Sequence, residues 1–224
     1  MSPANYPVVK ICCISSIEEA ALAIKYGANA LGLVGNMPSG PGVISDELIA
    51  EISAYAPENI ETFLLTSETT ADQIISHHNK VNTSTIQIVD RIETMVYRSL
   101  RKELPGIKLV QVIHVIDEDS AAEAAEYAQF ADALLLDSGN PSLAVKQLGG
   151  TGRTHNWELS LKIRELAEIP VYLAGGINPA NVNDAFNFVK PFGIDLCSGV
   201  RTAGRLDEAK LRDFFNEIRK FKSA

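Results

Sequence analysis

Two glycine-containing turns in the C-terminal quarter of the chain have the residue types of an anion-binding site. They are residues 173–179 (LAGGINP) and 195–200 (DLCSGV). Glycine adopts positive φ and lets the backbone approach a ligand closely, so successive N–H groups can point at a phosphate. A helix that starts directly after each turn would add its positive dipole end. We therefore predict a phosphate site at Gly175, Gly176, Ser198 and Gly199. The alternative is that these glycines merely end strands.

Two further residues, Cys12 and Asp137, stand at the ends of apolar runs and are candidates for proton transfer. Asp137 follows three leucines, where ionisation is costly and the pKa should rise towards that of a useful acid. A thiolate at Cys12 needs the opposite shift, which a cation such as Lys10 can provide. An acid and a base that face one phosphate pocket indicate proton transfer on a phosphosugar.

Each of these candidates has a structural alternative. A free cysteine such as Cys12 is often only a small buried hydrophobic residue. Asp137 can belong to a loop-entry turn, and Asp195 can be an ion-pair partner for Lys10. Two histidines, His77 and His78, lie at a polar helix end, where we expect solvent exposure.

Other groups carry a weaker signal. On its strand, His114 can face a ligand or simply pack. No spacing of His, Cys and carboxylate residues supports a metal site.

The elements that must position these residues alternate along the chain. Short apolar runs are predicted as strands at 8–13, 30–34, 62–66, 85–89, 109–115, 133–137, 171–174 and 194–198. Helical periodicity separates them at 16–26, 46–55, 71–79, 92–103, 120–130, 158–167, 179–189 and 207–221. This pattern predicts a parallel α/β fold. An open doubly wound sheet usually has a glycine-rich loop after its first strand, and residues 12–15 (CCIS) are not such a loop. We therefore predict one (β/α)₈ TIM barrel over residues 1–224, with its site at the C-terminal ends of the strands.

Alternation along the first predicted strand assigns its side chains to two faces. Lys10 and Cys12 should point into the barrel, whereas Val9, Ile11 and Cys13 should face the helices.

Two helix starts are also predicted from sequence. Ser15 and Glu18 have the spacing of a capping box, and Asn178 precedes Pro179 as a cap residue precedes the first helical position.

Composition narrows the class of partner. The formal net charge of −8 argues against nucleic acid or an anionic membrane as the main ligand. No apolar run approaches the ~20 residues of a membrane span. Three cysteines, two of them adjacent, do not form a disulfide framework, so we expect a cytoplasmic protein. The oligomeric state cannot be predicted from the sequence.

The motifs together resemble those of the phosphoribosylanthranilate isomerase family. Residues 9–15 (VKICCIS) are similar to that family's opening Val-Lys-Ile-Cys-Gly-Ile-Thr, and residues 27–34 (GANALGLV) to its second strand. Residues 134–138 (LLLDS), 149–154 (GGTGRT) and Trp157 resemble its sixth strand and the loop that follows. The glycine turns described above complete the resemblance, which runs nearly from end to end.

The resemblance implies a cofactor-independent aldose–ketose isomerase of tryptophan biosynthesis. Its substrate would be a small phosphorylated sugar amine, N-(5-phosphoribosyl)anthranilate, which undergoes an Amadori rearrangement to a 1-deoxyribulose 5-phosphate. Carried over by motif, Asp137 would be the general acid and Cys12 the general base. The same four residues, Gly175, Gly176, Ser198 and Gly199, would hold the phosphate. Asp195, Gly150 and Arg201 would contact the rest of the substrate.

The sequence departs from the family pattern at the aryl end of the site. The family's glycine after the catalytic cysteine is Cys13 here, and its Gly-Val-Glu after the last strand ends in Arg201. Its Ser-Pro-Arg-Tyr after the second strand, whose arginine binds the anthranilate carboxylate, is replaced by residues 36–43 (NMPSGPGV). Arg201 or Arg153 would have to supply a cation instead. Two alternatives therefore stay open: an isomerase for another phosphoribosylamine, and a non-catalytic barrel that binds a phospholigand.

Overall fold

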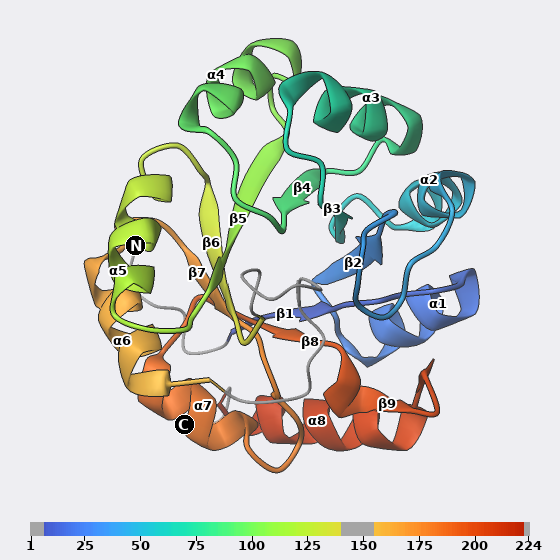
Figure 1. The fold of residues 1–224 in the computed structure, drawn as a ribbon. Helices are drawn as coiled ribbons and strands as arrows, with labels where there is room; N and C mark the ends of the chain where they lie inside the picture. Colours follow the sequence, from blue (N-terminus) through green and yellow to red (C-terminus); the bar gives the residue numbers. More distant parts are fainter. Residues whose placement is uncertain (1–6, 140–154, 222–224) are drawn as a thin grey trace.

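Within residues 7–139 and 155–221, which this computed structural model describes, eight parallel strands close into a barrel in their order along the chain (Figure 1). The strands are β1 (Val8–Ile11), β2 (Ala30–Val34), β3 (Glu61–Thr66), β4 (Thr85–Ile88), β5 (Lys108–His114), β6 (Ala133–Asp137), β7 (Val171–Leu173) and β8 (Gly193–Leu196). The helices around them are α1 (Ile17–Tyr26), α2 (Asp46–Tyr55), α3 (Ala71–Val81), α4 (Thr94–Glu103), α5 (Asp119–Tyr127), α6 (Trp157–Leu166), α7 (Val182–Val189) and α8 (Glu208–Lys220). The (β/α)₈ prediction is confirmed. That a single domain spans all of residues 1–224 stays a prediction.

Three short elements between β8 and α8 were not predicted. A 3₁₀ turn, η1 (Ser198–Val200), is followed by a two-stranded hairpin of β9 (Arg201–Thr202) and β10 (Arg205–Leu206). Their sequence is too short to show a period, so periodicity could not reveal them.

The first helix begins one residue later than predicted. Ser16 is the N-cap of α1, and its Oγ accepts a hydrogen bond from the backbone N–H of Glu19 at 3.2 Å. In return, Oε2 of Glu19 accepts from the N–H of Ser15 at 3.1 Å. Both Ser15–Glu18 and Ser16–Glu19 have the spacing of a capping box. Because Glu19 also bonds Arg201, the second register is the one that forms.

The start of α7 also differs from the prediction. Pro179 lies in a turn, and the helix begins only at Val182, with Asn181 as its N-cap. The Oδ1 atom of Asn178 accepts a hydrogen bond from the N–H of Ala180, which closes that turn. The cap–proline pair therefore initiates a turn that precedes the helix.

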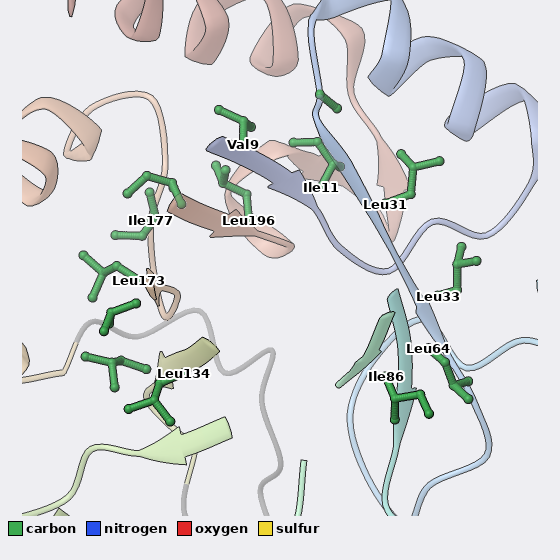
Figure 2. Packing of buried hydrophobic residues seen from close by; sticks show 14 of the residues in the cluster. Val9, Ile11, Leu31, Leu33, Leu64, Ile86, Leu134, Leu173, Ile177 and Leu196 are labelled. Atoms are coloured by element: carbon green, nitrogen blue, oxygen red, sulfur yellow. The ribbon is translucent and has the colours of Figure 1, made fainter. Parts of the chain in front are cut away.

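Apolar side chains form two layers that follow the alternation of the strands. The larger layer lies between the barrel and the helices, and Figure 2 shows Val9, Ile11, Leu31 and Leu33 among the side chains that belong to it. The smaller one fills the barrel interior and contains Val112, Leu135, Phe63, Tyr172 and Ala174. Alternate residues on each strand thus pack against the helices. The residues between them face the barrel interior, and those at the strand ends can reach the site.

His77 and His78 are buried, and the prediction that they are solvated was wrong. Nδ1 of His77 lies 3.2 Å from Oγ1 of Thr66, and its Nε2 lies 3.1 Å from a carboxylate oxygen of Asp46. Nε2 of His78 lies 2.8 Å from the carbonyl oxygen of Thr83. These partners come from β3, α2 and a loop, so the local polarity of the helix end could not reveal them.

The described helices include none that is long and apolar enough to cross a membrane.

A buried ion pair joins the first and last strands where the barrel closes. Nζ of Lys10 lies 2.9 Å from Oδ2 of Asp195, its direct neighbour across the β1–β8 pair. Lys10 is fully buried and its ammonium also lies over the ring of Phe63. Burial alone would lower the pKa of Lys10, but the charge of Asp195, the neighbouring Cys12 and the hydrogen bond to Asp195 together raise that pKa. Lys10 is therefore a permanent cation inside the barrel.

We expect Asp195→Leu to lower the free energy of unfolding by about 3–5 kcal/mol, because it leaves the buried ammonium of Lys10 without a counter-charge. The double variant Lys10→Met, Asp195→Leu should recover most of that loss, since it removes both charges. Urea denaturation of both proteins measures the difference. A double variant no more stable than the single one would contradict this account of the pair.

Candidate active site

One pocket opens among the loops that follow the strands, and it brings most of the predicted site residues together. Cys12, Asp137, Asp195, Gly175, Gly176 and Ser198 all line it. Of the other predicted residues, Gly199 and Arg201 do not line it, and Gly150 and Arg153 lie outside the described residues. The rest of the lining is Cys13, Val34, Met37, Ser39, Gly40, Pro41, Leu65, Gln87, Val112, Leu135, Ala174, Ile177 and Cys197.

Cys12 points into the barrel, as its parity predicts. Its backbone N–H donates to the carbonyl of Leu196 at 2.7 Å, which continues the β1–β8 pairing past the end of the strand. The neighbouring position on β2 is Gly32, where an added Cβ would lie 2.8 Å from Sγ of Cys12 and 3.1 Å from Nζ of Lys10. The missing side chain therefore leaves room for the thiol beside the buried ammonium of Lys10.

Asp137 lies at the end of β6 and is only 7% exposed. Leu134 and Leu136 point towards the helices, whereas Leu135 and Asp137 face inward. Oδ1 of Asp137 accepts hydrogen bonds from the backbone N–H of Ser138 at 2.7 Å and from its hydroxyl at 3.4 Å. The carboxyl group is thus held in place at the pocket wall.

The loop after β7 has the backbone that a phosphate cradle requires. Gly175 and Gly176 have positive φ angles of 77° and 66°, which residues other than glycine rarely adopt. Side-chain amides of Asn178 and Asn181 donate to the carbonyl oxygen of Gly176 at 3.1 and 3.0 Å. These bonds fix the direction of the peptide group between the glycines and the turn.

Helix dipoles contribute less to this cradle than predicted. The helix after β7 begins only at Val182, and η1 is the only helical element directly after β8 within the described residues. Any anion would therefore be held mainly by backbone N–H groups of the two loops.

Gly199 has a packing role in the structure. A Cβ there would lie 2.0 Å from the carbonyl oxygen of Ile177, so only glycine allows the loops after β7 and β8 to approach this closely. Its contribution to a phosphate site is indirect, because it places Ser198 beside Gly175 and Gly176 at the pocket rim.

Arg201 is placed behind the site, where it makes no contact with the pocket. Its guanidinium forms a two-point ion pair with Glu19, with both N···O distances 3.0 Å. Its Nη2 also donates to the carbonyl oxygens of Cys12 at 3.2 Å and Cys13 at 2.5 Å. The expected substrate contact is therefore replaced by a clamp that holds the backbone carrying Cys12. Sequence could not show this, because Glu19 is remote along the chain.

Cys13 faces the pocket and not the helices, so its predicted orientation was wrong. The strand ends at Ile11, and Cys13 has a φ of 62°, which breaks the alternation. Its side chain fits against the loop after β2 at Gly42, where an added Cβ would lie 2.5 Å from Cβ of Cys13. A glycine in one loop thus accommodates a cysteine in a backbone conformation that favours glycine.

Two site residues were not singled out from the sequence. Gln87 on β4 is buried, lines the pocket, and has no hydrogen-bond partner for Oε1 among the described residues. The signal in the sequence was its spacing of two residues from Thr85 on the same strand, which places both side chains on the inward face.

The second of these residues, His155, lies beside the glycine loop after β7, since a Cβ on Gly175 would lie 3.0 Å from its Nδ1. Burial lowers the pKa of His155 to about 4, against the opposing charge of Asp137, so the imidazole is neutral at pH 7.

Of the two alternatives for His114, the structure shows the packed one, with its Nε2 3.0 Å from the carbonyl oxygen of Val89. The described residues include no cluster of His, Cys, Asp and Glu suited to a metal ion.

Comparison with known proteins finds one family by sequence, and similar solved structures include members of the same family. A family model described as N-(5'-phosphoribosyl)anthranilate (PRA) isomerase matches residues 9–217. The N-(5'-phosphoribosyl)anthranilate isomerase of Methanosarcina acetivorans is 31% identical to this chain. The alignment covers 94% of this chain and 92% of that protein. The solved isomerase of Pyrococcus furiosus superposes with a TM-score of 0.80 at 27% identity, over 96% of this chain and 100% of that one.

A further solved phosphoribosyl anthranilate isomerase is similar and holds a ligand. It is in complex with reduced 1-(o-carboxyphenylamino)-1-deoxyribulose 5-phosphate. It has a TM-score of 0.77 at 26% identity and covers 96% of this chain and 99% of that one.

We expect Cys13→Gly to be more stable than Cys13→Ala by about 1 kcal/mol, because a left-handed backbone penalises any Cβ but not glycine. Both variants remove the same sulfur, so their difference isolates the backbone. At ordinary positions the order is reversed. Thermal or urea unfolding of the two variants measures it, and a more stable alanine variant would show that residue 13 is unstrained.

Proposed function

The chain belongs to the N-(5'-phosphoribosyl)anthranilate isomerase family, and we propose that it catalyses the Amadori rearrangement of N-(5'-phosphoribosyl)anthranilate to 1-(o-carboxyphenylamino)-1-deoxyribulose 5-phosphate. The observation that carries the residue roles is that Cys12 and Asp137 line one pocket together with the glycine loop after β7. The rearrangement moves protons and conserves electrons, so an acid and a base suffice for it.

Asp137 is proposed as the general acid that protonates the ribose ring oxygen and opens the ring to an imine. Its Oδ1 already accepts two hydrogen bonds from Ser138, which suits the carbonyl oxygen of a protonated carboxyl group. The proton is therefore assigned to Oδ2. The carboxyl group is buried beside Leu135 at the wall of the pocket, within reach of a bound ligand.

Cys12 is proposed as the general base that removes the proton from C2 of the opened sugar. The enaminol that results then gives the ketose when C1 gains a proton and the hydroxyl group on C2 loses one. The buried ammonium of Lys10 lies beside the sulfur that would accept the proton from C2. Arg201 acts through the backbone carbonyls of Cys12 and Cys13 and is proposed as a positioning residue.

The phosphate is proposed to bind at Gly175, Gly176 and Ser198, with Gly199 holding the two loops together. The two positive-φ glycines expose backbone N–H groups without a side chain in the way. In a barrel of this kind the loops after the seventh and eighth strands are the usual phosphate site. Asp195 is proposed to support the site through its ion pair with Lys10.

A cytoplasmic location remains a prediction from cysteine usage.

A second candidate function is the same rearrangement on a phosphoribosylamine without an aryl carboxylate. The described residues that line the pocket include two carboxylates but no lysine, arginine or histidine. Met37, Ser39, Gly40 and Pro41 form the wall after β2, where the family resemblance would place an arginine. This observation favours a less acidic substituent on the amine.

We expect Cys12→Ala and Asp137→Asn each to lower kcat/KM by about 10²–10⁴, the usual contribution of one acid or base. Each variant should still bind reduced 1-(o-carboxyphenylamino)-1-deoxyribulose 5-phosphate. Steady-state kinetics and calorimetry measure the two properties. Asp213→Asn removes an exposed carboxylate on α8 and is the control. Full activity in either site variant would contradict the assigned roles.

A pair of substrates separates the two candidate functions. If anthranilate is the natural substituent, kcat/KM for N-(5'-phosphoribosyl)anthranilate should exceed that for the aniline analogue by about 30-fold, or ~2 kcal/mol for a paired carboxylate. We expect this preference. Equal values for the two compounds would instead support the second candidate, and no turnover of either would contradict both.

A further inference from the structure

All three cysteines of the chain lie at the same end of the barrel, and two of them are in direct contact. Sγ of Cys13 and Sγ of Cys197 are 2.6 Å apart although the residues are separated by 184 positions. This distance is only about half an ångström longer than a disulfide bond, ~2.05 Å. Neither sulfur has a role in the proposed acid–base chemistry, so the contact calls for a separate explanation.

The backbone holds the two sulfurs together from both sides. Cys13 adopts its left-handed conformation while its carbonyl oxygen accepts a hydrogen bond from Arg201, and Gly42 closes over its Cβ. Cys197 directly follows β8, whose pairing with β1 continues as far as Leu196 and Ile11. The contact is therefore fixed by the seam where the barrel closes.

The two thiols differ in a way that suits a reactive and a resolving cysteine. Cys13 is buried, whereas Cys197 is partly exposed and can meet a reagent that enters the pocket. The hydrogen bond with Cys13 and the charge of Arg201 lower the pKa of Cys197 against the effect of burial. Hydrogen bonds to Cys12 and Cys197, together with burial, raise the pKa of Cys13. Cys197 is the more nucleophilic sulfur of the pair.

We propose that Cys13 and Cys197 form a site of reversible oxidation, at which a hydroperoxide converts the two thiols into a disulfide between the ends of β1 and β8. The Cys197 thiolate attacks the peroxide, becomes a sulfenic acid, and releases one molecule of alcohol or water. The Cys13 thiol then attacks the sulfenic sulfur, loses its proton, and a second water leaves. Two thiols lose two electrons, and the peroxide gains them.

A disulfide here acts on the active site, a consequence that rests on the proposed function. Cys13 adjoins the proposed base Cys12 in sequence and lines the same pocket. Cys197 adjoins Ser198 of the proposed phosphate loop. A disulfide ties the two loops together at the pocket rim, so it should inhibit the enzyme until a dithiol reduces the bond.

The test uses the reduced full-length protein, hydrogen peroxide and mass spectrometry. After peroxide treatment and alkylation under denaturing conditions, we expect one alkylated cysteine instead of three, and a linked peptide pair containing residues 13 and 197. Cys12→Ser should form the same link, because it keeps the pair. Cys13→Gly and Cys197→Ser should not form it, and the glycine variant suits the left-handed backbone at that position.

The outcomes separate the disulfide from the function. A link that involves Cys12, or oxidation of all three cysteines without any link, would overturn the proposal. If the link forms and dithiothreitol reverses it, the site is supported even when the reduced protein has no isomerase activity, in which case the proposed function fails alone. If the reduced protein is active, its activity should fall in proportion to the linked fraction and return on reduction. Activity that stays constant as the link forms would overturn the inhibitory role.

Discussion

The ion pair between Lys10 and Asp195 lies at the one place where the first and last strands of the chain meet. A cation in the interior of a barrel is tolerated only with a counter-charge, so the pair fixes the neighbouring strand as well as its register. Beyond it, along the same seam, lie the bond from Cys12 to Leu196, the contact between Cys13 and Cys197, and the clamp of Arg201. The proposed base and phosphate loop are thus held by the interactions that close the barrel.

The alternation of side chains divides stability from chemistry along each strand. On β6, Leu134 and Leu136 pack against the helices while Leu135 and Asp137 face inward. Glycines then set how closely groups approach each other inside: Gly32 leaves room for the thiol of Cys12, and Gly199 allows two loops to touch. The site is therefore shaped as much by side chains that are absent as by those that are present.

Sequence reasoning succeeded where the determinant was local and periodic. Strand period and apolar runs predicted the barrel, the inward direction of Cys12, and the position of Asp137 at the end of β6. It failed where the determinant was a partner remote along the chain. The burial of His77 depends on Thr66 and Asp46, and the placement of Arg201 depends on its ion pair with Glu19. Cys13 was misplaced because one left-handed residue ends the alternation, and an isolated sequence does not reveal φ at a cysteine.

The clamp formed by Glu19 and Arg201 imposes a joint constraint on two distant parts of the gene. Among the described residues, the guanidinium of Arg201 donates to the carboxylate of Glu19 and to the carbonyl oxygens of Cys12, Cys13 and Gly204. An acidic residue at 201 would place a second negative charge beside Glu19 and remove the donor for the carbonyls, and a basic residue at 19 would place a second positive charge beside Arg201. A change of charge at either position is therefore expected to require a matching change at the other. We therefore expect a chimera to lose this ion pair if one end of its barrel comes from a relative with a different charge at position 19 or 201.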